Sequence, residues 1–183
     1  MKKHTYTIFV AGFMTLISCS GAIKTASFQD ALGSKIIPPG KACVYIYRPA
    51  KFTGAAIDLN VYDVTKSVAD GKTNVSGDGD NYDIDLNSVF AYGVLLGTLK
   101  TKEFIAVECE PGERIIVARM RARPLLGEQN KNLVKLNLEA DKKYYVHIEF
   151  GWGGRALIQT VGETDALKDI SNCHVTDRKI PVE

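Results

Sequence analysis

The sequence predicts a mainly β fold: an antiparallel β-sandwich of the immunoglobulin- or transthyretin-like Greek-key type, with one short C-terminal helix and a long hairpin insertion. Three observations predict it. About seven short runs alternate apolar with polar residues, which is the period of a half-buried strand. Turn residues recur roughly every ten positions, as in sandwich domains. Helical spacing of apolar residues appears only near the C-terminal end.

The first half of the domain is expected to contribute four strands. Alternating β-branched, aromatic and other apolar residues predict them at residues 42–47, 57–61, 104–109 and 114–120. Between the last two, Pro111 presets a bend and Gly112 can take positive φ. The segment Glu110-Pro111-Gly112-Glu113 is therefore predicted as the turn of a hairpin.

The second half is expected to add three strands and the helix. The strands are predicted at residues 134–138, 144–150 and 156–161. From Thr164 the spacing of apolar residues changes from the period of a strand to that of a helix. Thr164 is the expected helix cap, and Asp165 is expected in the first turn. Ala166, Leu167 and Ile170 form a short apolar stripe.

One domain is expected over residues 41–175, followed by a tail at 176–183. Within the domain, residues 65–90 differ in kind, because Asp, Gly, Asn and Ser dominate and apolar residues are sparse. We interpret this segment as a long insertion in a hairpin.

The N-terminal residues have the layout of a secretory signal over residues 1–18. Lys2 and Lys3 precede an apolar run over residues 8–17. That run is about 15 Å long as a helix, which is half the thickness of a bilayer core, so a transmembrane helix is disfavoured. Leu16-Ile17-Ser18-Cys19 resembles the bacterial lipobox. The alternative is ordinary cleavage at or just beyond Cys19, with Cys19 a spectator.

The lipobox resemblance implies cleavage before Cys19 and covalent lipid on its thiol and new amine. Two or three acyl chains hold a protein stably on a membrane. The protein is therefore expected to be exported and lipid-anchored to the cell envelope. In a Gram-negative host, Ser20 after the cysteine resembles the outer-membrane sorting rule. Residues 19–40 lack a sustained period and suit a flexible tether.

Charge argues against a nucleic-acid partner. The chain has 23 basic and 21 acidic residues, and residues 1–18 contain two lysines and no acidic residue. The mature chain is therefore formally neutral and lacks the phosphate attraction on which nucleic-acid binders rely. The expected partners are the membrane, through the lipid, and another envelope protein or a second copy of this chain.

Three cysteines remain once Cys19 is lipidated: Cys43, Cys109 and Cys173. An oxidising compartment permits one disulfide among them, and a buried free thiol is an equally good interpretation of Cys109.

An acidic cluster in the insertion offers oxygen ligands to a cation such as Ca²⁺. Its carboxylates belong to Asp78, Asp80, Asp83 and Asp85. The spacing fits an EF-hand poorly, because glycine is at the second position and no glutamate is at the twelfth. The favoured interpretation is a small strand with a solvated acidic face.

Arginines form a second candidate site, for an anionic lipid, polymer or partner. Arg119, Arg121 and Arg123 would share one face of an extended segment, with Arg114 nearby. The alternative is a wet sheet face on which these arginines pair with acidic residues of a neighbouring strand.

Aromatic residues form a third candidate site, for a sugar or peptide. Tyr144, Tyr145, Phe150 and Trp152 are close in sequence. Core packing is the commoner role of such residues.

No catalytic residues are expected. Cys173 and His174 are adjacent and point different ways at a helix end, and no nucleophile elbow, zinc-protease helix or phosphate loop appears. Zinc binding by Cys109, Cys173, His147 and His174 is disfavoured, because folding would have to bring four residues together that show no zinc-site spacing in the sequence. No cofactor other than the covalent lipid is expected, with Ca²⁺ as the alternative.

The order and spacing of several segments resemble a domain of unknown function in bacterial lipoproteins (DUF2846-like), similar to PEGA-type β-sandwich domains. The matching segments are residues 44–49 with Phe52, then 60–62, 110–113, 138–146 and the closing helix up to Cys173. Residues 92–99 match a glycine-containing strand of that pattern. The resemblance implies a β-sandwich lipoprotein without assigned catalytic residues.

The expected function is therefore that of a non-enzymatic, membrane-anchored envelope lipoprotein that acts as a protein-interaction or structural module at the cell surface or in the periplasm. The alternative is a surface protein that binds a ligand: a cation at the acidic insertion, or a glycan or anionic polymer at the arginine and aromatic faces.

Overall fold

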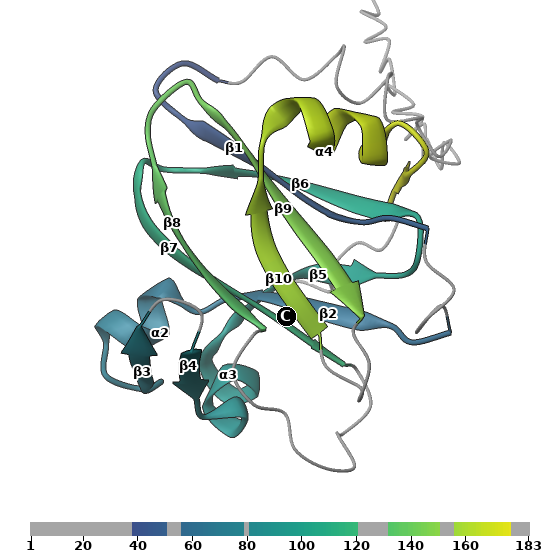
Figure 1. Cartoon of the computed structure of the whole chain (residues 1–183). Helices are drawn as coiled ribbons and strands as arrows, with labels where there is room; N and C mark the ends of the chain where they lie inside the picture. Colours follow the sequence, from purple (N-terminus) through teal and green to yellow (C-terminus); the bar gives the residue numbers. More distant parts are fainter. Residues whose placement is uncertain (1–37, 51–55, 79–80, 121–131, 151–155, 177–183) are drawn as a thin grey trace, which may run out of the picture.

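Two β-sheets pack face to face in the computed structural model, which describes residues 38–50, 56–78, 81–120, 132–150 and 156–176 (Figure 1). A small third sheet and a helix lie on different flanks of this sandwich. The predicted mainly β sandwich with a short C-terminal helix and a hairpin insertion is confirmed.

Sheet A has five strands, in the order β10 (Ala156–Val161), β9 (Lys143–Phe150), β1 (Ala42–Arg48), β6 (Glu103–Cys109) and β11 (His174–Val175). β1 runs antiparallel to β6 but parallel to β9, and β11 runs parallel to β6. Parallel neighbours need long connections, and the chain visits the other sheet between β1 and β9. Sheet A is therefore mixed, where the sequence predicts antiparallel neighbours throughout.

Sheet B has four antiparallel strands, in the order β5 (Val94–Leu99), β2 (Leu59–Asp63), β7 (Gly112–Met120) and β8 (Leu133–Leu138). Because β2 and β5 are direct neighbours, the chain between them is an insertion in a hairpin. The insertion contains α2 (Thr65–Ala69), β3 (Val75–Asp78), β4 (Asn81–Ile84) and α3 (Leu86–Tyr92), and β3 and β4 pair with each other.

The predicted hairpin at residues 110–113 is wrong. β6 before it belongs to sheet A and β7 after it belongs to sheet B, so the chain crosses between the sheets here. Gly112 does take the positive φ expected of the bend, at 123°. Turn residues specify a sharp change of direction, whereas the packing of the apolar faces decides which strand becomes the neighbour.

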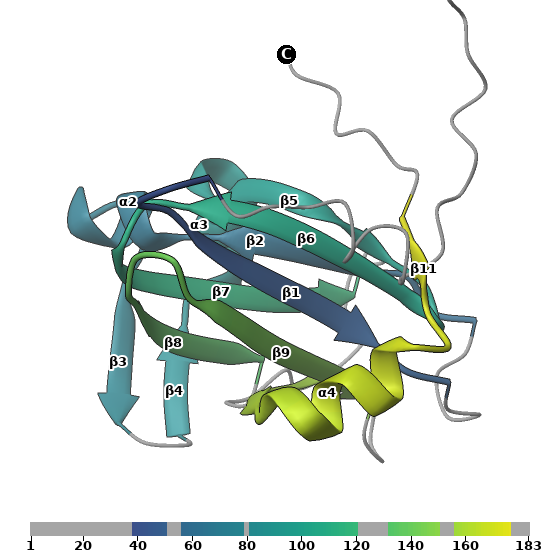
Figure 2. The ribbon, with the colours of Figure 1, turned by 90° about the horizontal axis from the view of Figure 1, so that it is seen from above.

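The C-terminal helix α4 spans Glu163–Ile170 and lies against β1 and β9 (Figure 2). Its N-cap is Gly162, with no side-chain cap, so the predicted cap at Thr164 is wrong. Glu163 instead anchors the first turn, since its Oε1 accepts a hydrogen bond of 2.8 Å from the Tyr145 hydroxyl. An acidic residue in the first turn also suits the helix dipole.

The core between the sheets is formed by the inward residues of both sheets. It includes Val44, Ile46, Leu59, Val61, Ile116, Ala118, Val146 and Ile148. Two further apolar clusters lie on the outer faces. One joins sheet A to α4 and contains Tyr45, Tyr47, Phe104, Tyr145, Ala166 and Ile170. The other joins sheet B to the insertion and contains Tyr62, Val64, Val89, Ile115, Val117 and Leu133.

Within the part of the chain that the structure describes, no helix has the length and apolar composition needed to cross a membrane.

Close packing at the end of the insertion gives a stability prediction for Gly93. A Cβ atom at Gly93 would lie 2.5 Å from the Val89 carbonyl oxygen and 3.1 Å from Val64 Cγ1. Gly93→Ala should therefore lower the free energy of unfolding by about 1–3 kcal/mol, because backbone must shift to make room. Urea unfolding measures this change. The control is Gly162→Ala, whose Cβ would meet nothing within 4 Å. The control should cost less than about 1 kcal/mol, and equal losses in both variants would contradict the packing.

Candidate interaction surface

The three cysteines of the domain are buried. Cys43, Cys109 and Cys173 are free thiols, so no disulfide joins any two of them. Burial raises the pKa of Cys109, and it raises the pKa of Cys173 to about 11. The thiolate is the form of cysteine that attacks substrates and binds metals. Cys109 and Cys173 therefore stay protonated near neutral pH, in the form that is least reactive.

The four residues weighed for zinc lie on separate elements: Cys109 in β6, His147 in β9, Cys173 after α4 and His174 in β11. The described segments contain no group of three or more His, Cys, Asp or Glu placed to hold a metal ion. The His147 ring stacks on Tyr47, with centroids 5.3 Å apart, and its Nδ1 lies 3.4 Å from Gln159 Nε2. His147 is thus packed on the outer face of sheet A.

The acidic cluster of the insertion is only partly visible. Asp83 on β4 and Asp85 after it are exposed, whereas Asp80 and the side chain of Asp78 lie outside the described residues. Asp85 caps α3, because its Oδ1 accepts a hydrogen bond of 3.0 Å from the Asn87 amide. Such a cap contributes about 1 kcal/mol. Asp85 therefore has a structural role, and calcium binding by the cluster stays a prediction.

The structure does not bring Arg114 and Arg119 together. They are five residues apart on β7, so strand alternation places them on opposite faces of sheet B. Arg114 Nη2 donates to the Glu110 carbonyl oxygen at 3.3 Å, near the crossing between the sheets. Arg119 is only 4% exposed, beneath the insertion. The other two arginines of the predicted stripe, Arg121 and Arg123, lie outside the described residues.

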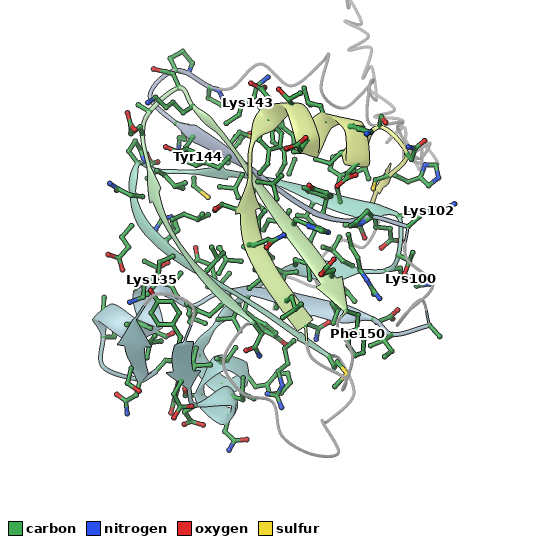
Figure 3. The ribbon with its side chains drawn as sticks, viewed as in Figure 1. Lys100, Lys102, Lys135, Lys143, Tyr144 and Phe150 are labelled. Carbon is green, nitrogen blue, oxygen red and sulfur yellow. The ribbon has the colours of Figure 1, made fainter. Side chains whose placement is uncertain are left out.

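The predicted aromatic site is not gathered on one surface. Figure 3 shows Tyr144 and Phe150 at opposite ends of β9. Tyr144 is half-buried, and its hydroxyl accepts a hydrogen bond of 2.8 Å from the Glu139 amide. Tyr145 is buried and stacks on Tyr45, and Phe150 is also buried. Trp152 lies outside the described residues.

Exposed apolar side chains gather instead where α3 leads into β5. Among the described residues, the large hydrophobic side chains that are exposed are Phe90 (41%), Tyr92 (54%) and Val94 (60%). They lie within five consecutive positions where α3 leads into β5, and these three side chains are called here the α3–β5 patch. Single exposed apolar residues are ordinary on a protein surface, whereas several in one short segment make that segment a candidate interaction site.

Two cationic side chains of sheet B contact aromatic rings of the insertion. The Arg119 guanidinium lies 3.8 Å from the Phe90 ring centroid, and its Nη1 donates to the Leu86 carbonyl oxygen at 2.9 Å. Lys135 of β8, labelled beside the insertion in Figure 3, lies 4.7 Å from the Tyr82 ring centroid. A desolvated cation–π contact such as that of Arg119 stabilises by about 2 kcal/mol, and an exposed one such as that of Lys135 stabilises by about 0.5–1 kcal/mol. Phe90 is therefore held against sheet B through one side of its ring, while 41% of the residue stays exposed.

The patch continues into an edge strand. β5 is at one edge of sheet B, and its sequence Val-Leu-Leu-Gly-Thr-Leu contains no charge and no proline. Charged residues and proline commonly protect an edge strand from pairing with other chains, and β5 lacks both. The second half of β5 is partly covered, since Thr176 Oγ1 donates to the Thr98 carbonyl oxygen at 3.3 Å. Its first half, beginning at Val94, is the more open part.

The α3–β5 patch is not among the candidate sites that the sequence predicts. The apolar stretch Val89-Phe90-Ala91-Tyr92 ends a segment dominated by Asp, Gly, Asn and Ser. One signal was available. An apolar stretch with two aromatic residues in an otherwise polar insertion needs either a core or a partner, and the insertion itself is too small to bury all of it.

Comparisons with known proteins show little. No family model matches the chain, and no curated protein matches it. The crystal structure of the type VI secretion (T6SS) lipoprotein TssJ1 from Pseudomonas aeruginosa is similar at a TM-score of 0.38 and 15% sequence identity. The match covers 68% of this chain and 98% of that one. A likeness at this TM-score carries no argument about fold or function, and the resemblance to the DUF2846-like lipoproteins stays a prediction.

Proposed function

We propose that this protein is an exported lipoprotein, held at the cell envelope by lipid on Cys19, and that its sandwich acts there as a protein-interaction module rather than as an enzyme. The observation that carries the interaction role is the α3–β5 patch at the open end of an edge strand. Cys19 itself lies outside the described residues. The anchor rests on the sequence Leu16-Ile17-Ser18-Cys19 after a signal-like apolar run.

A role without catalysis is supported by where the reactive groups lie. The thiols of Cys109 and Cys173 are buried with raised pKa values, and His147 is packed against Tyr47. Burial also raises the pKa of Tyr45, Tyr47 and Tyr145 well above the ordinary value for tyrosine, so these phenols stay protonated. A general acid or base works best with a pKa near the working pH. These side chains are suited to packing and hydrogen bonding.

We expect the segment between Cys19 and the domain to act as a tether at the membrane surface, as its sequence predicts. Eighteen residues lie between Cys19 and the first described residue, Pro38, and an extended chain of that length spans roughly 60 Å. The sandwich can therefore turn the α3–β5 patch towards a partner in the membrane or beside it. In a Gram-negative host, Ser20 favours the outer membrane as the site of anchoring.

The anchor is tested with Cys19→Ser. This variant should move the protein from the membrane fraction to the soluble fraction, because no thiol remains at the lipidation position. Wild-type protein extracted from membranes should have an intact mass equal to a chain that starts at Cys19 plus diacylglycerol and acyl groups. The control Cys109→Ser should stay in the membrane fraction. A soluble wild-type chain that starts beyond Cys19 and lacks lipid would refute the anchor.

The interaction role is tested by formaldehyde crosslinking in intact envelopes. Wild-type protein should form a discrete larger species, and the double variant Tyr92→Ser/Val94→Ser should lose most of it. Phe90 is kept in this variant because its ring covers Arg119. The matched control is Asn137→Ser, an exposed residue on β8 at the other edge of sheet B. Recovery of uncrosslinked wild-type monomer alone, or equal crosslinking of all three proteins, counts against the role.

A further inference from the structure

We propose that the C-terminal segment of this chain, residues 177–183, lies along the open half of β5 as an added outer strand of sheet B and blocks that edge. The segment follows Thr176, and its own residues lie outside the described part of the chain. The inference goes beyond the proposed interaction role, because it concerns what covers the edge when no partner is bound.

Thr176 places the start of this segment beside β5. Its amide donates to the Phe104 carbonyl oxygen of β6 at 3.0 Å, and its Oγ1 donates to the Thr98 carbonyl oxygen of β5 at 3.3 Å. Thr176 therefore bridges the two sheets at the end of the sandwich where β6 begins, which is where β11 lies (Figure 2). The chain that leaves Thr176 starts in contact with the second half of β5.

The direction of β11 leads the chain back along β5. β11 runs parallel to β6. β5 and β6 are joined by residues 100–102 and run in opposite directions, so that a Cβ atom at Gly97 would lie 2.7 Å from Ile105 Cδ1. β11 is therefore antiparallel to β5, and an extended continuation of β11 approaches the first residue of β5.

The segment is long enough to cover the open half of β5. Val94 precedes Thr98 by four residues, which is about 13 Å along a strand. Ile180 follows Thr176 by four residues, so an antiparallel continuation brings Ile180 to Val94. Val94 is 60% exposed, and its side chain would lose contact with water beneath such a cover.

The composition of the segment is that of a protected edge strand. Its sequence Asp-Arg-Lys-Ile-Pro-Val-Glu contains four charged residues and one proline, both of which β5 lacks. Charges and proline on the outermost strand hinder pairing with further chains, and proline in a sheet is found mainly at edges. The two remaining residues, Ile180 and Val182, alternate and supply apolar side chains for contact with β5.

An irregularity of β5 favours a segment of the same chain over a strand from another molecule. Val61 of β2 is opposite Gly97 and Tyr62 is opposite Leu95, so Leu96 is an extra residue in β5. Such a bulge bends the strand and hinders pairing with a long, straight partner strand. A short segment that is already held beside β5 at Thr176 loses little freedom on docking, and its effective concentration is high.

A partner that uses the same edge must displace the segment. This consequence rests on the proposed interaction role. When the edge is free in only a fraction of the molecules, the apparent affinity of the partner falls by that fraction. The segment would thus control access to the open half of β5.

Hydrogen exchange of the purified full-length chain, compared with a chain that ends at Thr176, tests the proposal. Removal of residues 177–183 should speed exchange of those amides of residues 94–96 that point away from β2 by about five-fold or more, because their cover is lost. Ile180→Ser/Val182→Ser should have most of this effect at unchanged chain length. The matched control Asp177→Ser/Lys179→Ser should stay within about two-fold of wild type, because exposed charges contribute little.

Four outcomes would overturn the proposal. Equal exchange of residues 94–96 in the full-length and shortened chains is the first, and an equal effect of the two double variants is the second. The third is a wild-type dimer in sedimentation whose β5 protection survives the shortening, which would identify a second copy as the occupant. The fourth is faster exchange of the β7 amides of Val117 and Ala118 as well, which would show that the segment supports the whole sandwich instead of one edge.

Crosslinking in intact envelopes tests the control of access separately. The chain that ends at Thr176 should give about two-fold more of the crosslinked species than wild type, or a larger excess. Equal yields would show that the partner does not compete for β5 and would remove this consequence. Absence of a crosslinked species from both chains would refute the interaction role, whereas the position of the segment is decided by the exchange experiment alone.

Discussion

The structure depends on one constraint: the central strands are apolar on both faces. Each sheet must therefore pack against the other sheet on its inner face and against a further element on its outer face. All seven residues of β1 are buried. On β7, Ile116 and Ala118 face the core between the sheets, whereas Ile115 and Val117 face outward. Burial of one such side chain stabilises by about 1.5–3 kcal/mol, so an uncovered outer face would be costly. Helix α4 covers sheet A, and the insertion covers sheet B.

Because of this constraint, the insertion is part of the core packing and not an accessory loop: it covers the outer face of sheet B. As a cover it needs an apolar inner side, which Val64, Val89 and Tyr82 provide, and it is fixed further by Arg119 and Lys135. A small cover cannot bury every apolar side chain that it contains. Phe90 and Tyr92 of α3 stay partly exposed, next in sequence to exposed Val94 of β5, and the proposed interaction role follows from these side chains.

The strand positions could be predicted because alternation with period two is local, and β1, β6 and β10 match the predicted ranges within a residue. Sheet membership could not be predicted at Pro111, because the same turn residues serve a hairpin and a crossing between sheets. The sequence predicts Asp85 as a possible cation ligand, whereas its role as a helix cap depends on where α3 begins. By strand alternation, Arg119 is expected on a solvent-exposed face of its strand. It is buried because the insertion, a segment distant in sequence, folds over it. The prediction for Cys19 depends on local sequence alone and stays a prediction.

The central claim is that the insertion is a folded cover of sheet B, and native-state hydrogen exchange across a urea series tests it most directly. The Val89 and Gly93 amides donate to the carbonyl oxygens of Asp85 and Val89. We expect both amides to lose protection at the same urea concentration as the β7 amides of Val117 and Ala118, because cover and sheet unfold together. Exchange of residues 86–93 at the rate of an unstructured peptide, while β7 stays protected, would contradict the claim.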